Sequence, residues 1–267
     1  MQICILLLIQ IIPAYGTKIF SESDILNHKD YNRSLQIFND IENQMAGIKD
    51  TDSSETVRGL RTRSFHSYVH LIYVLLKLSD AKSYFEIGSW CGASLALALS
   101  IPEVQTVISL DQDMRNNTPT LLKNAKTFNK YNAKTYMLSG NSHQKKWKDA
   151  VADILKDTKV DVLFIDGDHR MGGAFEDFVS FQQHVRPGGF IIWDDYNDNV
   201  YSPGVAKAVS AVMKSRFASC YRMIGDIPNV AGACSFGHSF KKGGPLVGHE
   251  VAAKSNEFIM QKLYSCQ

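Results

Sequence analysis

The sequence lacks the features that would assign it to several large classes of protein. Its 5 cysteines are too few for a disulfide framework in a chain of 267 residues, and no Cys-x-x-Cys pair indicates a zinc site. No apolar run reaches the roughly 18–20 residues that a membrane-spanning helix needs. Because 29 Lys and Arg against 27 Asp and Glu leave a formal net charge of +2, we expect no nucleic-acid partner bound through a broad basic surface. The 45% of hydrophobic residues suffices for a packed core, which favours an α/β enzyme.

Residues 1–16 begin with a short apolar segment. The run Ile3–Ile12 is apolar except for Gln10, and Ala14-x-Gly16 follows it with the small residues of a cleavage site. This pattern favours a secretory signal peptide and therefore the secretory pathway, although the usual positively charged segment is missing. The alternative is an N-terminal apolar helix that packs on the domain or on another subunit, which is compatible with the cytoplasm.

Residues 17–60 are predicted to form a helical preface. Apolar residues from Leu35 to Ile48 recur at helical spacing, and this stripe indicates a packing face or the contact surface of a homo-oligomer. A second helix is predicted over 64–78. From Ser83 onward, short apolar strands alternate with amphipathic helices, which predicts βαβ units and a mostly parallel sheet covered on both faces. The expected strands are Tyr84–Ile87, Thr106–Leu110, Thr135–Leu138, Val160–Ile165 and Phe190–Trp193, and the expected helices are Ala93–Ser100, Thr120–Asn129, Trp147–Leu155, Gly173–His184 and Val205–Phe217.

Two further apolar runs, Tyr221–Ile224 and Ala231–Phe236, predict a C-terminal antiparallel hairpin with its turn at Asp226–Asn229. Cys220 and Cys234 could face each other there, and we favour two buried thiols over a bridge. The main domain is therefore predicted over 61–237. The tail, 238–267, contains a helix-like stretch near 256–263.

The first signal for chemistry lies at the first strand-to-helix turn, which reads Glu-x-Gly-x-x-x-Gly-x-Ser. Gly88 and Gly92 let the backbone approach a ligand, and helix N-terminal amides near Ser94 can hold a carboxylate. Glu86 at the end of the strand could hold an amine. A site for both groups suits the amino-acid end of S-adenosylmethionine, and a tight turn without a ligand is the alternative. The Gly-x-Gly-x-x-Gly of dinucleotide folds is absent, which argues against a nicotinamide-dependent oxidoreductase.

This segment resembles the first motif of class I S-adenosylmethionine-dependent methyltransferases and is especially similar to that of catechol O-methyltransferase. The fold that the resemblance implies is a Rossmann-like three-layer sandwich, with a mostly parallel seven-stranded sheet and a C-terminal antiparallel hairpin. Asp111 ends the second strand roughly 20 residues past the glycines, where a carboxylate can accept the ribose hydroxyls, with helix capping as the alternative. Asn141 and Ser142 follow the third strand, where the family contacts adenine.

The strongest signal is a set of acidic residues at the ends of the fourth and fifth strands. Asp166 ends the fourth strand, and Asp194 and Asp195 end the fifth. Parallel neighbouring strands would bring these carboxylates together, and a divalent cation such as Mg²⁺ would relieve their repulsion. Asp168 and His169 lie beside them.

The stretch from Asp161 to Tyr196 resembles the methyltransferases grouped as family 24, which include cephalosporin-hydroxylase-like proteins. The shared pattern is Ile-Asp-Gly-x-His, an amphipathic helix, Arg-Pro-Gly-Gly and an Asp-Asp pair. The resemblance implies that Asp166, Asp194 and Asp195 are the metal ligands.

Together these residues predict a divalent-metal-assisted O-methyltransferase that acts on a small hydroxylated acceptor. His169 is our choice of general base, because the pKa of a histidine ordinarily lies near 6.5. Asp168, the second catalytic candidate, and His169 stand where the catechol enzyme has its lysine base. The alternative for His169 is a helix-entry residue that hydrogen-bonds Asp168. A non-catalytic S-adenosylmethionine-binding module is the alternative from another class of function.

Overall fold

The computed structural model describes residues 18–44, 48–49, 56–57, 69–90, 92–112, 114–196, 198, 202–228 and 256–264. Its helices are α1 (Glu22–Leu26), α2 (Tyr31–Gln44), α3 (Val69–Leu78), α4 (Ala93–Leu99), α5 (Met114–Phe128), α6 (Lys145–Leu155), α7 (Met171–Phe181) and α8 (Val205–Met213), with short 3-10 turns η1 (Gln182–His184) and η2 (Arg216–Cys220). Its strands are β1 (Ile48–Lys49), β2 (Thr56–Val57), β3 (Ser83–Ile87), β4 (Thr106–Asp111), β5 (Lys134–Ser139), β6 (Val160–Ile165), β7 (Val185–Trp193), β8 (Tyr221–Pro228) and β9 (Asn256–Lys262).

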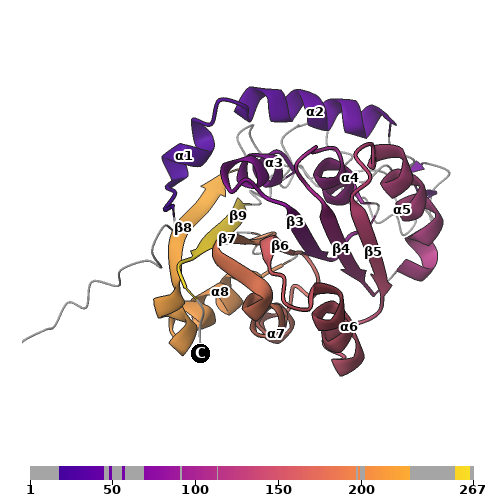
Figure 1. The fold of residues 1–267 in the computed structure, drawn as a ribbon. Helices are drawn as coiled ribbons and strands as arrows, with labels where there is room; N and C mark the ends of the chain where they lie inside the picture. The colour runs from indigo at the N-terminus through magenta and orange to yellow at the C-terminus, as the bar shows by residue number, and fades with distance from the viewer. Residues whose placement is uncertain are drawn as a thin grey trace, which may run out of the picture.

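One seven-stranded sheet organises the domain, in the order β5-β4-β3-β6-β7-β9-β8 (Figure 1). The strands β3 to β7 run parallel, and β9 is antiparallel to both of its neighbours. Helices α3, α4 and α5 cover one face, with α2 lying across α3 and α4, while α6, α7 and α8 cover the other (Figure 1). This arrangement confirms the predicted three-layer α/β fold with a C-terminal antiparallel strand pair. No helix among the described residues is long and apolar enough to cross a membrane.

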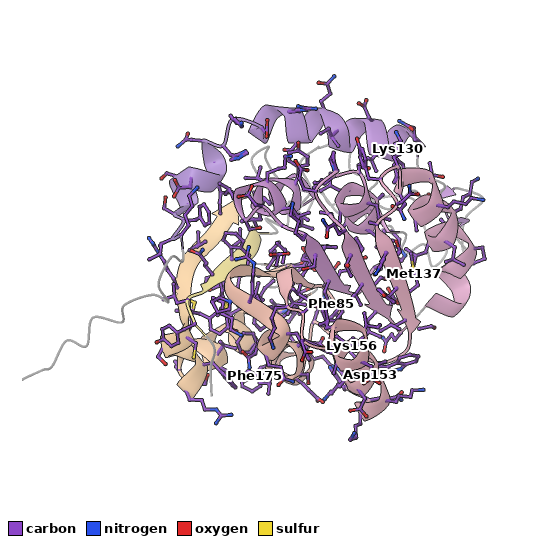
Figure 2. The ribbon with its side chains drawn as sticks, viewed as in Figure 1. Phe85, Lys130, Met137, Asp153, Lys156 and Phe175 are labelled. Carbon is purple, nitrogen blue, oxygen red and sulfur yellow. The ribbon has the colours of Figure 1, made fainter. Side chains whose placement is uncertain are left out.

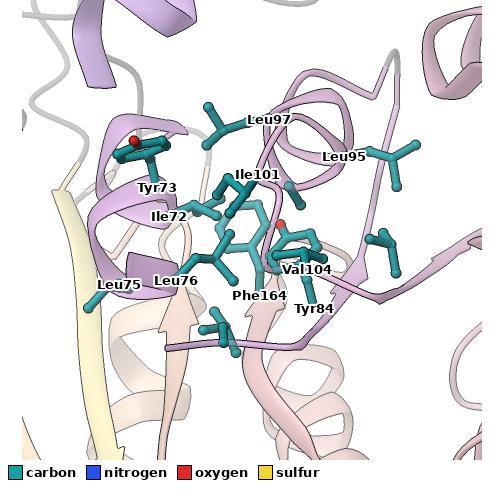
Figure 3. Packing of buried hydrophobic residues seen from close by; sticks show 14 of the residues in the cluster. Ile72, Tyr73, Leu75, Leu76, Tyr84, Leu95, Leu97, Ile101, Val104 and Phe164 are labelled. Atoms are coloured by element: carbon teal, nitrogen blue, oxygen red, sulfur yellow. The ribbon is translucent and has the colours of Figure 1, made fainter. Parts of the chain in front are cut away.

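Two hydrophobic cores lie on the two faces of the sheet, because successive side chains of a strand point to opposite faces. Tyr84 of β3 and Phe164 of β6 pack against residues of α3 and α4, such as Leu76 and Leu97 (Figure 3). Phe85, the next residue of β3, is fully buried in the other core with the apolar faces of α6, α7 and α8 (Figure 2). The five strands predicted between 84 and 193 are confirmed. Four of them are short, apolar and largely buried, whereas β5, at the edge of the sheet, is only partly buried.

The preface contains helices α1 and α2, as predicted, but its described residues also include the short antiparallel strands β1 and β2, which were not predicted. Ile41 of α2 and Ile25 of α1 are buried in the same core as α3 and α4. Ile41, which belongs to the apolar stripe, therefore packs against the domain itself. The N-terminal apolar segment, residues 1–16, lies outside the described residues.

The predicted helix near 256–263 is wrong, because Asn256–Lys262 form strand β9. This strand lies between β7 and β8, so both of its edges are paired, and five consecutive residues from Phe258 to Lys262 are buried. Its side chains enter the cores on both faces of the sheet, Ile259 on one and Met260 on the other. A strand buried on both faces loses the alternation that identifies a strand in sequence. The predicted turn is also misplaced, since β8 continues to Pro228 and pairs with β9. The run 231–236 lies outside the described residues.

Cys220 is disulfide-bonded, so the predicted free thiol at this position is wrong. Cys234 lies outside the described residues. A bridge between these two cysteines, the alternative to two buried thiols, is therefore not tested.

Candidate functional site

A cavity of about 700 Å³ opens at the edge of the sheet where the parallel strands end. Open α/β sheets bind their ligands at this edge. Most of the predicted site residues line this cavity: Gly88, Asp111, Asn141, Ser142, Asp166, Asp168, His169, Asp194 and Asp195. The predicted residues Glu86, Gly92 and Ser94 are not part of its lining.

The turn from β3 to α4 is shaped by backbone packing. Gly88 has φ +85, and a Cβ atom there would lie 1.9 Å from the carbonyl oxygen of Asp166. Gly92 has φ +81, and its Cβ would lie 2.5 Å from a methyl group of Leu121. The glycines therefore permit close contact with β6 and α5, and Gly88 also lines the cavity. The exposed Trp90, which has φ 41, extends this wall and was missed from the sequence.

Asp111 holds this turn in place. Its Oδ2 atom accepts hydrogen bonds from the amides of Ser89 at 2.7 Å and Trp90 at 2.8 Å. The carboxylate thus stabilises the turn that borders the cavity, which resembles the capping alternative. Because Asp111 also lines the cavity, this contact is compatible with a ligand on its other side.

Glu86 of β3 is fully buried and does not line the cavity. Its Oε2 atom accepts hydrogen bonds from Ser94 Oγ at 2.5 Å and Tyr84 OH at 2.9 Å. Its Oε1 atom is buried and has no hydrogen-bond partner among the described residues. Desolvation raises the pKa of Glu86 to about 7 in spite of these hydrogen bonds.

We expect the replacement Glu86→Gln to alter how stability depends on pH. The folded protein keeps a proton on Glu86 up to about pH 7, whereas the unfolded chain releases it near pH 4.5. The free energy of unfolding therefore falls between these two pH values, by up to about 3 kcal/mol from this group, and glutamine removes that loss. In urea denaturation, the free energy of unfolding of Glu86→Gln relative to wild type should be more favourable at pH 8 than at pH 5. An equal difference at both pH values would contradict the raised pKa.

The loop after β5 forms a second wall. The Asn141 side chain accepts a hydrogen bond from the amide of His143 at 2.8 Å, and Ser142 Oγ donates to Asp177 Oδ1 at 2.6 Å. His143 Nε2 lies 3.3 Å from the same carboxylate oxygen, although it is not aligned for a hydrogen bond. This carboxylate, fully buried on α7, raises the pKa of His143. Asp177 was not identified from the sequence, because its partners come from another part of the chain.

The acidic residues predicted at the ends of β6 and β7 do meet. Single ligand atoms of Asp166, His169 and Asp194 lie within 4.8 Å of one another. His169 Nε2 is 3.0 Å from Asp166 Oδ1, and Asp194 Oδ1 is buried without a hydrogen-bond partner among the described residues. Desolvation raises the pKa of both Asp166 and Asp194 well above the usual range, and for Asp194 the neighbouring carboxylates raise it further. A divalent cation would offset this accumulated negative charge.

Asp195 is placed differently from Asp194. Its backbone is in the left-handed region, with φ 55, and its Oδ2 atom accepts a hydrogen bond from Ser202 Oγ at 2.8 Å. Ser202 Oγ is also 2.7 Å from His169 Nδ1, so the serine bridges the imidazole and this carboxylate. Ser202 was missed from the sequence because it follows β7 in a loop without a motif.

Asp168 lines the cavity but forms an ion pair with Arg170, with Nη2 2.5 Å from Oδ2. The guanidinium lowers the pKa of Asp168. A carboxylate with a lowered pKa is a weak base, so the structure does not support a proton-accepting role for Asp168.

The sheet order, the glycine turn at its centre and the cavity over the strand ends define the class I methyltransferase fold. A family model described as a methyltransferase domain matches residues 85–196, and the chain belongs to this methyltransferase family. A relative, the uncharacterized protein R132 of Acanthamoeba polyphaga mimivirus, is 31% identical over 180 residues, which cover 64% of this chain and 80% of that protein.

Solved structures share the fold at low sequence identity. The O-methyltransferase from Bacillus cereus, solved in complex with SAH, has a TM-score of 0.52 and 16% identity, covering 90% of this chain and 94% of that one. The O-methyltransferase TomG from Streptomyces achromogenes, in complex with SAM, has a TM-score of 0.54 and 13% identity, covering 91% and 93%. A putative caffeoyl-CoA O-methyltransferase from Staphylococcus aureus has a TM-score of 0.51 and 14% identity, covering 86% and 91%.

Proposed function

We propose that this methyltransferase transfers the methyl group of S-adenosylmethionine to a hydroxyl oxygen of a small acceptor, with a divalent cation bound at the ends of β6 and β7. The observation that carries the proposal is the convergence of Asp166, His169 and Asp194 on the cavity, beside the glycine turn of the methyltransferase fold. Two solved O-methyltransferases of the same fold contain SAH or SAM, which supports this donor.

The two sides of the cavity suggest where each reactant binds. The donor would lie between the turn held by Asp111 and the loop that carries Asn141 and Ser142, because both line the same cavity. The acceptor would then lie toward Asp166 and Asp194. Holding two reactants in line contributes on the order of 7–11 kcal/mol to such a reaction.

The acidic cluster has the donor atoms that a divalent cation needs. Asp166 and Asp194 would hold it, since Asp194 has a buried oxygen without a partner in the described structure and both carboxyl groups are desolvated. Asp195 is the third ligand that the family resemblance implies, although its Oδ2 atom is held by Ser202. A bound cation supplies charge that lowers the pKa of a substrate hydroxyl.

His169 is the group best placed to accept the proton of the acceptor hydroxyl. If the ionised Asp195 accepts the Ser202 hydrogen, then Ser202 Oγ is left to accept the hydrogen on His169 Nδ1. Nε2 is then the ring nitrogen that would accept the proton, once a cation holds the Asp166 carboxylate whose Oδ1 atom lies 3.0 Å away. A positioned base of this kind typically contributes 10²- to 10⁴-fold.

A methyl-transfer screen tests the proposal. The protein is incubated with radiolabelled S-adenosylmethionine and catechols, sugars or small polyols, with Mg²⁺ or Mn²⁺ added and with EDTA as the matched control. We expect transfer to at least one hydroxylated acceptor, and its loss in EDTA. Transfer that is unaffected by EDTA would contradict the cation, and calorimetry that shows binding of NADH in place of S-adenosylmethionine would contradict the donor.

A further inference from the structure

Asp177 is a buried carboxylate on a helix, and its side chain contacts residues of two loops that lie elsewhere in the sequence. It lies on α7, and its side chain is fully buried. Its Oδ1 atom accepts the Ser142 hydroxyl at 2.6 Å, and Oδ2 has no hydrogen-bond partner among the described residues. A Cβ atom on Gly167 would lie 3.1 Å from Oδ2, so the carboxylate also borders the loop that follows Asp166.

The two loops that Asp177 contacts both form walls of the cavity. Ser142 and His143 belong to the loop after β5, and Gly167 belongs to the loop after β6. Asp177 itself does not line the cavity. A buried carboxylate is costly unless its partners compensate for lost hydration, and an apolar side chain would fill the same place in α7 at no such cost. The presence of a carboxylate at this position is therefore best explained by its contacts with these two loops.

Other interactions hold the start of the loop after β5, at Gly140, in place. The amide of Gly140 donates to the carbonyl of Asp111 at 2.9 Å, and the Trp147 ring covers Gly140 so closely that a Cβ there would lie 1.7 Å from its Nε1 atom. Between these points, the side chain of Ser142 is anchored to Asp177. This hydrogen bond fixes how the middle of the loop faces the cavity.

We propose that Asp177 is a positioning residue, which holds the loop of Ser142 and His143 in the shape that binds the methyl donor. This inference rests on the proposed function, because it assigns the loop to the donor side of the cavity. At metal sites, removing a group that orients the ligands typically costs 10- to 100-fold in affinity, and we expect a loss of this order here. Asp177 should therefore act on donor affinity more than on the methyl-transfer step.

Calorimetry with S-adenosylhomocysteine tests this role in the full chain. We expect Asp177→Ala to raise the dissociation constant by about 10-fold or more, and Ser142→Ala, which removes the same hydrogen bond from the other side, to raise it in the same direction. In the double variant the two effects should not add, because both remove one interaction. The KM for the donor should rise, with kcat at saturating donor within about three-fold of wild type.

Asp153→Asn is the matched control. Asp153 is an exposed carboxylate on α6, and no hydrogen bond or ion pair joins it to Ser142 or His143 among the described contacts. The donor affinity of this variant should equal that of wild type. If Asp177→Ala does not fold, Ser142→Ala carries the test. Wild-type affinity in the variants, or a lower melting temperature alone, would overturn the inference, whereas a wild-type protein that binds no S-adenosylhomocysteine would overturn the proposed function itself.

Discussion

Replacing Asp194 by asparagine should strongly reduce methyl transfer while the protein still binds its donor. The substitution keeps the size of a fully desolvated side chain but removes one of the two carboxylates that would hold the cation. Charge stabilisation by a bound cation is worth several kcal/mol, and each 1.36 kcal/mol changes a rate tenfold, so turnover should fall about 10²- to 10³-fold. Initial rates with the acceptor found in the screen measure this loss, and calorimetry should give a donor affinity close to that of wild type.

The melting temperature offers a second readout for Asp194→Asn. Without added metal the variant should be more stable than wild type, because like charges from Asp166 and Asp195 raise the pKa of Asp194 beyond the effect of its desolvation. Added Mn²⁺ should raise the melting temperature of wild type and leave that of the variant unchanged, since a ligand stabilises only the fold that binds it. Asp153→Asn, which changes an exposed carboxylate on α6, is the control and should behave as wild type (Figure 2).

The variant His169→Ala tests whether His169 acts as a base or as a ligand of the cation, by the same measurements of turnover and melting temperature. As a base, His169 should affect turnover and leave the shift in melting temperature with Mn²⁺ intact. Loss of that shift would instead place His169 among the ligands, as its position within 4.8 Å of the carboxylate atoms also permits. Full turnover in Asp194→Asn would contradict the cation site altogether.

The parallel part of the sheet could be predicted because each strand is a short apolar run followed by a polar turn. The fully buried strands β3 and β6 end just before Gly88 and Asp166, where the pattern changes abruptly. The position of β9 could not be predicted in this way. Its buried Gln261 and Lys262 look like residues of an exposed helix face, but their side chains bond to main-chain carbonyls of distant segments, including Lys18 and Gln182.

The acidic cluster was predictable for a topological reason, since neighbouring parallel strands bring their carboxyl ends together. The residues that orient the cluster and the loop after β5 could not be predicted. Ser202 lies 33 residues from His169, and Asp177 lies 35 residues from Ser142. Neither pair has a fixed spacing or a motif, so only the folded chain shows that these side chains meet.

Replacing Gly88 by alanine should unfold the domain or leave it only marginally stable. The new Cβ atom would lie 1.9 Å from the backbone carbonyl oxygen of Asp166, and φ +85 is itself unfavourable for a residue with a side chain. The obstructing atom belongs to the backbone directly after β6, where the amide of Asp166 is held by the carbonyl of Ile87, so it cannot rotate away. We expect a loss of more than about 4 kcal/mol, which is a large part of the stability of an ordinary domain. Urea denaturation followed by circular dichroism measures it.

Gly172→Ala is the matched control for this prediction, because nothing lies within 4 Å of a Cβ atom there and Gly172 is helical. Its stability should be unchanged or raised by up to about 1 kcal/mol. A Gly88→Ala protein as stable as wild type, with only its donor affinity reduced, would show that this glycine serves the approach of a ligand. The expected loss of stability would show that contact between β3 and β6 requires it, and that the same contact places Asp166 beside the turn that borders the cavity.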